Sequence, residues 1–181
     1  TSKMDDTQAG LADGSIDTSF GGGTGTVLAG MGAEADYASD VTVQPDGKLL
    51  LTGSSSTGGK SDFVMMRLNP DGTPDASFGG GGTVKIAISA LGNDSGRVAA
   101  VQPDGKILVA ANAMIGLDDD FSVMRLNADG SLDTSFGNAG IASIRVSGWH
   151  DNANSITLQD DGKILVGGSA GRGSCSSPCR S

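Results

Sequence analysis

Short apolar segments separated by turn signals run along the chain, and they predict β-strands rather than helices. In the middle of the chain, residues 83–88, 97–102, 106–111 and 121–127 are rich in Val, Ile, Leu and Ala and are bounded by Gly, Pro and Asp. The PDGK sequence at residues 103–106 predicts a tight hairpin between the second and third of these segments. We therefore expect four antiparallel strands in this stretch.

The same order of strands and turns occurs three times. Phe20, Phe78 and Phe136 are 58 residues apart, inside the stretches DGSIDTSFGGG, DGTPDASFGGG and DGSLDTSFGNA. A second signature recurs as QPDGKLLL, QPDGKILV and QDDGKILV. A period of this length is typical of solenoids, arrays and propellers. Four antiparallel strands per period favour a β-propeller blade, which is stable only when it is stacked against neighbouring blades.

The repeats define the domains that we expect. Residues 1–12 are an N-terminal segment with a candidate ring-closing strand. Three blades follow at residues 13–70, 71–128 and 129–170, and the third lacks its last strand. Residues 171–181 are a tail that departs from the repeat. Propellers typically have four to eight blades, so three blades cannot close a ring. Two-fold assembly is common in soluble proteins, and we expect a homodimer that forms a six-bladed ring.

Aromatic and arginine side chains recur with the same period. All five Phe residues occupy repeat positions, and we expect them to pack between blades. Arg67 and Arg125 are each followed by Leu and Asn, and we expect them to tie one blade to the next.

The two signatures together resemble the delta-60 repeat, which occurs in tandem arrays of bacterial, exported proteins. The resemblance rests on xQPDGKILVxG followed by DFxxxRLNxDGSLDxSFGxxG, and it covers roughly residues 13–168. It implies an all-β, propeller-like array and an extracellular or periplasmic location for the parent protein. It implies no catalytic consensus, and no signal peptide opens this chain.

Composition narrows the range of functions. The formal net charge is −9, and the 21 acidic residues include a single glutamate, Glu34. Asp together with 30 Gly is typical of turns, and the alternative reading is that Asp binds divalent cations. Dispersed basic residues argue against nucleic acid, and no apolar run is long enough to span a membrane. Cys175 and Cys179 are only a weak signal for a metal site or a disulfide, and we assign them no role.

Candidate chemistry gathers at one end of the expected blades. Loops at the end with the PDGK turns are nearly identical in every repeat, whereas loops at the opposite end differ. Alignment on the Gln of each xQxDGK signature makes Asp36, Asp94 and Asp151 equivalent. The same divergent loops hold the only Trp, His, Tyr and Glu of the chain, and we expect the acidic run 118–120 in a loop beside them.

Two functions from different classes fit this pattern. The first is a metal-assisted hydrolase of small esters or phosphotriesters, by fold-level analogy with propeller lactonases and organophosphate hydrolases. Asp36, Asp94 and Asp151 would hold a divalent cation, with calcium favoured and zinc or manganese as alternatives. His150 or Asp151 would take the proton, and a small-molecule substrate would contact Glu34, Tyr37, Asn93 and Trp149. The second function is a non-catalytic extracellular binding or structural module.

Overall fold

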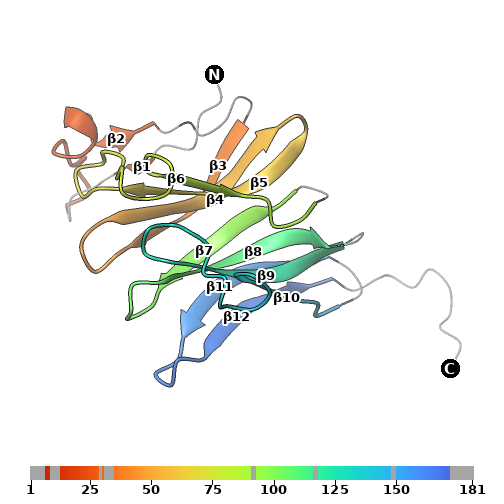
Figure 1. Cartoon of the computed structure of the whole chain (residues 1–181). Helices are drawn as coiled ribbons and strands as arrows, with labels where there is room; N and C mark the ends of the chain where they lie inside the picture. Colours follow the sequence, from red (N-terminus) through yellow and green to blue (C-terminus); the bar gives the residue numbers. More distant parts are fainter. Residues whose placement is uncertain are drawn as a thin grey trace, which may run out of the picture.

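Two stacked four-stranded antiparallel sheets form the centre of the computed structural model, which describes residues 7–8, 13–28, 30, 35–90, 93–115, 118–147 and 150–171. The first sheet contains, in order, β3 (Ala35–Val43), β4 (Leu49–Thr57), β5 (Lys60–Leu68) and β6 (Thr83–Ile86). The second sheet contains β7 (Ser95–Val101), β8 (Ile107–Ile115), β9 (Asp118–Leu126) and β10 (Ile141–Ile144). The two sheets lie one above the other (Figure 1). The expected all-β class with four-stranded antiparallel units is confirmed.

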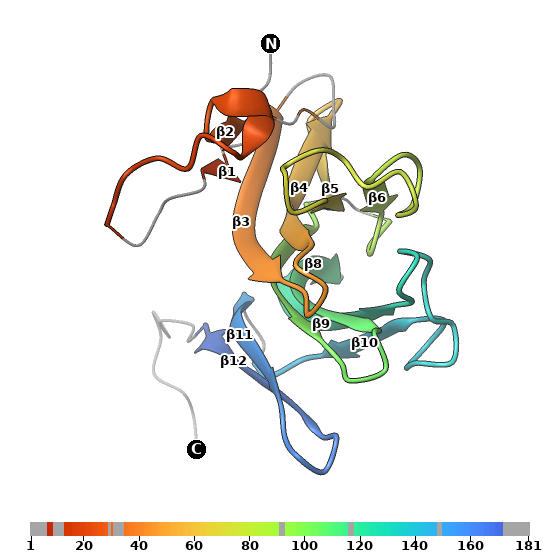
Figure 2. The ribbon, with the colours of Figure 1, turned by 90° about the vertical axis from the view of Figure 1, so that its left-hand side faces the viewer.

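Two shorter ladders flank these sheets. A third sheet consists of β11 (Asp151–Leu158) and β12 (Ile164–Ala170). An N-terminal ladder pairs β1 (Thr7–Gln8) with β2 (Thr26–Val27), which follows a short 3-10 turn, η1 (Gly21–Gly23). Figure 2 shows β6 and β10 on the opposite side of the molecule from β3 and β11. Among the described residues, no helix is long and apolar enough to cross a membrane.

The sheets and the sequence repeats are out of phase. We expected residues 83–88 to form one sheet with the three segments that follow, and this grouping is wrong because β6 pairs with the preceding strand β5. The crossover after β5 folds back on that strand: Asp75 N–H donates to the Arg67 carbonyl at 2.9 Å, and Arg67 N–H donates to the Gly82 carbonyl at 2.8 Å. The fourth strand of each four-stranded sheet therefore comes from the start of the next sequence repeat.

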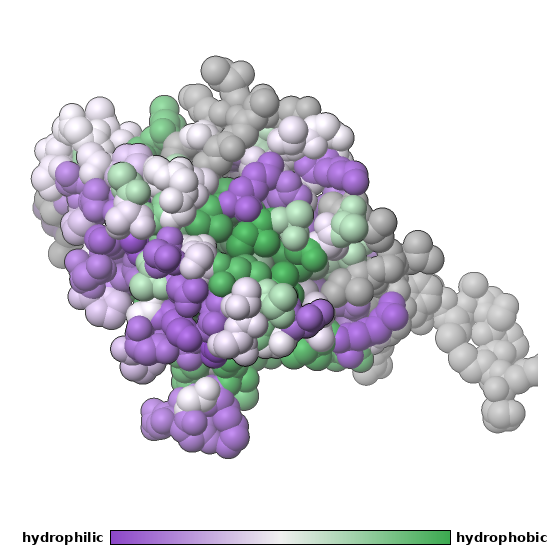
Figure 3. Space-filling view, in the orientation of Figure 1, coloured by the Kyte–Doolittle hydropathy of each residue, from purple (hydrophilic) through white to green (hydrophobic). Residues whose placement is uncertain are grey.

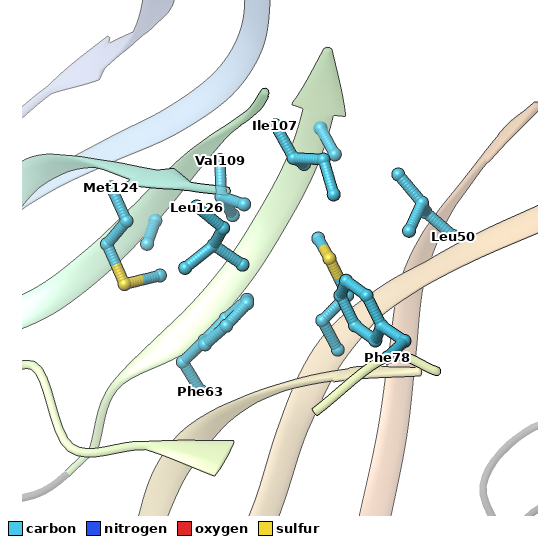
Figure 4. Packing of buried hydrophobic residues seen from close by; sticks show 10 residues of the cluster. Leu50, Phe63, Phe78, Ile107, Val109, Met124 and Leu126 are labelled. Carbon is cyan, nitrogen blue, oxygen red and sulfur yellow. The ribbon is translucent and has the colours of Figure 1, made fainter. Parts of the chain in front are cut away.

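The main core lies between the first and second sheets. Phe63 and Phe78 face Ile107, Val109 and Leu126 across this interface (Figure 4), and all five side chains are fully buried. Burial of one such side chain contributes about 1.5–3 kcal/mol relative to exposure, so most of the stabilising energy depends on neighbouring sheets being stacked.

Phe packing between sheets is confirmed for four of the five Phe residues, whereas Phe136 is half-buried and lies under the Arg125 guanidinium. Phe121 packs with Ala153 and Ile156 of the third sheet. Phe20, in the segment that leads into β2, packs with Leu51 of the first sheet. The repeat period thus places aromatic side chains where one sheet covers the next.

Candidate functional site

Turns and loops sort onto two ends of the sheets, as the sequence predicted. The self-similar end holds the PDGK turns and the crossovers, because Lys48 of the first turn lies 2.9 Å from Asp75 of the first crossover. The divergent end holds the segments that join one sheet to the next, where Asp94 N–H donates to the Ser61 carbonyl.

A cluster of charged and aromatic side chains occupies the self-similar end. The Oδ2 oxygen of the Asp75 carboxylate accepts a hydrogen bond from Arg67 Nε at 2.7 Å and forms an ion pair with Lys48 Nζ at 2.9 Å. The other oxygen accepts from the Ser77 hydroxyl at 2.7 Å, and the Arg67 guanidinium lies 4.5 Å from the centre of the Phe78 ring. The bonds from Lys48 and Ser77 hold the pKa of Asp75 well below its usual range.

The second repeat builds the same cluster. Asp133 receives Arg125 Nε at 2.7 Å and Lys106 Nζ at 2.8 Å, and the Arg125 guanidinium lies 4.7 Å from the Phe136 ring centre. Lys106, Ser135 and Arg125 lower the pKa of Asp133 in turn. The repetition of all four groups indicates that this cluster belongs to the repeat fold and not to a single reactive site.

Arg67 also connects repeats, as expected. Its Nη1 donates to the backbone carbonyl of Ala128 at 2.6 Å, which joins the first sheet to the turn after the second. Sequence reasoning selected this arginine but missed its acidic partner, Asp75. The signal was present, because the second Asp of DGxxDxSFG follows the arginine by eight residues in both copies.

Equivalent clefts open between neighbouring PDGK turns. One, of about 440 Å³, lies between the first two turns and is lined by Gln44, Lys48 and Val101 among others. Another, of about 390 Å³, lies between the second and third turns and includes Val101, Gln102 and Gln159. The side chain of Gln44 is buried, and its Oε1 has no hydrogen-bond partner in the described part of the chain.

At the divergent end, two of the equivalent aspartates bind backbone. Asp94 Oδ2 accepts N–H groups from Ile88 and Ser89 at 2.7 and 2.8 Å. Asp151 Oδ2 accepts N–H groups from Val146 and Ser147, both at 2.9 Å.

Asp94 therefore connects the segment after β6 to the start of the second sheet, and Asp151 connects the segment after β10 to the start of the third sheet. Asp94 and Asp151 are fully buried, and Asp36 is 2% exposed at the equivalent position of β3. The Ser147 hydroxyl also donates to Asp151 at 2.6 Å, and this bond lowers the pKa of the Asp151 carboxyl.

No three His, Cys, Asp or Glu side chains among the described residues are grouped so that they could hold a metal ion. Asp36, Asp94 and Asp151 lie on three separate sheets, at the start of β3, beside β7 and at the start of β11. The backbone N–H groups occupy one carboxylate oxygen, Oδ2, of Asp94 and of Asp151, while Oδ1 of Asp94 is buried with no hydrogen-bond partner among the described residues. The calcium, zinc or manganese site stays a prediction.

The imidazole of His150, one of the two candidate proton acceptors, lies beside Asp119. Its Nδ1 is 3.0 Å from Asp119 Oδ2 and 3.2 Å from the backbone N of Asp119. The neutral ring can accept from that N–H, and the protonated ring can donate to the carboxylate. Because the pairing joins residues 31 positions apart, sequence reasoning did not find it.

The acidic run at residues 118–120 is part of strand β9 and not of a loop, which corrects our expectation. Asp120 is 3% exposed, and its Oδ1 lies 3.6 Å from Arg145 Nε. The pairing of β9 with β8 extends as far as Asp118, so the run lies in an ordered ladder.

The remaining candidate residues have separate environments. Tyr37 projects from β3 with 58% of its surface exposed. Asn93 is exposed and has a left-handed backbone conformation, with φ of 68°, which Asn tolerates better than most residues. Glu34, Trp149, Cys175 and Cys179 lie outside the described residues.

Comparison with known families agrees with the fold. Residues 44–78 and 102–136 each match the family model described as "Domain of unknown function (DUF5122) beta-propeller". Each matched segment begins at the QPDGK turn and ends at the Phe of the SFG motif, so it contains the whole Lys–Arg–Asp–Phe cluster. The match supports a β-propeller repeat family. No curated protein and no solved structure matches the chain.

Proposed function

We propose that the chain is a non-catalytic β-propeller repeat module with a binding or structural role outside the cell. The observation that carries the proposal is that Asp94 and Asp151, two of the three acids that a metal centre would need, bind backbone. Both accept backbone N–H groups in the linkers between sheets. Recurring lysine and arginine residues bind Asp75 and Asp133 in the clusters at the opposite end.

The proposed module acts as a six-bladed ring made of two chains. Three units of this kind are too few to close, whereas six are an ordinary number for a propeller. Uncovered apolar faces at the ends of the stack favour such closure, because Val41 and Val43 of β3 and Leu165 of β12 are exposed.

A second candidate function is the metal-assisted hydrolase. The observation that favours it is the pairing of the exposed His150 imidazole with Asp119, because a carboxylate beside an imidazole orients the ring for proton transfer. In this version of the hypothesis, His150 takes the proton and Asp119 is the acid beside it.

Turnover of activated substrates separates the two functions. The assay uses a nitrophenyl ester and a nitrophenyl phosphotriester with calcium, manganese or zinc, and with chelator. The repeat module should show the same background rate in the parent chain and in His150→Ala. Metal-dependent turnover that chelator and His150→Ala both abolish would establish the hydrolase and refute the non-catalytic module.

A further inference from the structure

The two ends of the described fold are complementary halves of one four-stranded sheet. In the N-terminal ladder, Thr26–Val27 precedes Val84–Lys85 of β6 by 58 residues, and Thr7–Gln8 precedes Met65–Met66 of β5 by the same number. The ladder therefore corresponds to the third and fourth strands of a sheet. In the third sheet, β11 and β12 follow β7 and β8 by 57 residues, so they correspond to the first and second strands.

The strand edges of these halves also match. In both complete sheets the second strand pairs with the third, β4 with β5 and β8 with β9. Within the described residues, β12 pairs only with β11 and β1 pairs only with β2, so one edge of each is open. Open edges carry unpaired N–H and C=O groups that can pair with another chain.

Exposed apolar residues lie where the missing halves would cover them. On β3, Val41 and Val43 are 46% and 65% exposed, whereas their equivalents on β7, Ala99 and Val101, pack against the core under the first sheet. Among the described residues, the N-terminal ladder contains only β1 and β2, and no first or second strand beside them covers this part of β3.

The same relation holds at the other end. Leu165 of β12 is 49% exposed, although its equivalents Leu50 and Leu108 are fully buried. Ile144 of β10 is 48% exposed, although its equivalent Ile86 packs against the core. Apolar surface is visible near the β11–β12 turn (Figure 3). In a completed third sheet, the third and fourth strands beside β12 would cover Ile144. A further sheet stacked on the third sheet would cover Leu165.

We propose that β1–β2 of one copy pairs with β11–β12 of a second copy and completes a composite blade. The inference rests on the proposed ring and identifies the surface that joins it. The two complete sheets and one composite blade give three blades per chain. Closure within one chain would give only three blades, which is too few, whereas two copies give six.

A second copy fits this edge better than the chain's own C-terminal sequence. Residue 178, which follows Phe121 by 57 positions, is Pro where the third strand has Phe. Proline cannot donate to a ladder, so this sequence does not repeat the strand. The N-terminal ladder, in contrast, already has the third and fourth strands in the required order.

Disulfide capture between two different single-cysteine chains tests the composite blade. Both chains first carry Cys175→Ser and Cys179→Ser. Alignment by the repeat places Gln8 of one copy opposite Val166 of the other. The observed pairing of Gln8 with Thr26 is shifted by one residue from that alignment, and this pairing places Gln8 opposite Gly167. Paired strands bring Cα atoms within about 5.5 Å, which is within disulfide range.

The Gln8→Cys chain is refolded together with either the Val166→Cys or the Gly167→Cys chain and mildly oxidised. We expect a covalent 1:1 dimer in at least one mixture, and none from any chain refolded alone. A dimer by native mass spectrometry with no cross-link in either mixture would overturn the composite blade and leave the ring in place. A monomer would overturn both.

A surface substitution provides an independent measurement. Val43→Asp places a charge on the face of β3 that the composite blade would cover, and it should raise the dimer dissociation constant at least about tenfold. Leu28→Asp is the matched control, because Leu28 is also well exposed, at 59%. Its equivalent Ile86 faces the following sheet of the same chain, so Leu28 lies outside the surface that the second copy would cover. Equal dissociation constants for the two variants, both with parent-like circular dichroism, would contradict the proposal.

Discussion

Arg67 donates from Nη1 to the backbone carbonyl of Ala128 at 2.6 Å, across 61 residues of chain. The same guanidinium binds Asp75 and lies over Phe78, so one side chain links a strand, its crossover and the next repeat. Arg125 binds Asp133 and Ser135 in the same way, but within the described part of the chain it makes no bond equivalent to the one with Ala128, and its side chain is 21% exposed against 7% for Arg67.

Arg67→Lys should therefore destabilise the chain more than Arg125→Lys. Lysine keeps the charge but cannot bind Asp75, Ser77 and Ala128 together, because it lacks the planar fork of donors. A hydrogen bond from a charged group, such as the one from the guanidinium to the Ala128 carbonyl, contributes about 1.5–3 kcal/mol. Urea unfolding followed by circular dichroism measures both variants. Equal losses of stability would show that the contact with Ala128 contributes nothing.

Stability should fall in acid because of the two clustered carboxylates. The pKa values of Asp75 and Asp133 are lowered in the fold by their lysine and serine partners. Such groups stabilise the fold above the unfolded pKa of about 3.9, and this contribution is lost as the pH falls toward the folded pKa. The melting temperature should be level from about pH 5 to 7 and should decrease below about pH 4.

Asp75→Asn is the variant that assigns this acid response. It should lower the melting temperature at pH 7 and make the decrease below pH 4 shallower. Asp160→Asn is the control, because Asp160 is exposed in the third PDGK-type turn. An unchanged acid slope in Asp75→Asn would place the response in other groups.

Gly130 is constrained by its neighbours as well as by its backbone. It has φ of +88°, and a Cβ there would lie 2.7 Å from Val84 Cγ2 and 2.9 Å from Phe78 Cε2. Gly162 has a similar φ of +81°, but a Cβ would meet nothing within 4 Å. Gly162→Ala should cost only the backbone strain, about 1–2 kcal/mol.

Gly130→Ala should cost that strain and a further overpacking penalty of about 1–3 kcal/mol. Chemical denaturation of the two variants measures the difference directly. If both lose the same stability, the packing of Phe78 against the following repeat is loose enough to accept a methyl group, contrary to the geometry.

The sequence predicts some levels of this structure better than others. The spacing of the Phe residues predicts that neighbouring sheets stack, because only repeated stacking buries side chains at that period. It does not predict that β6 pairs backward with β5, since this depends on backbone bonds between Arg67, Asp75 and Gly82. The phase of the sheets was therefore misassigned although the strands themselves were located.

The site is harder to predict for a related reason. A pattern of equivalent Asp residues fits a cation site and backbone anchoring equally well, and only the positions of nearby N–H groups distinguish them. The pairing of His150 with Asp119 joins two sheets, so it depends on the stacking and leaves no local pattern in the sequence.

Asp151→Asn distinguishes anchoring from metal binding. The Asp151 carboxylate accepts two N–H groups and the Ser147 hydroxyl, and an amide offers one acceptor oxygen in place of two. The variant should therefore melt at a lower temperature than the parent, by the same amount in calcium and in chelator. His150→Ala is the control, because that side chain is exposed and should leave the melting temperature nearly unchanged. If the parent gains stability with calcium and Asp151→Asn loses only that gain, the carboxylate is a ligand and anchoring is secondary.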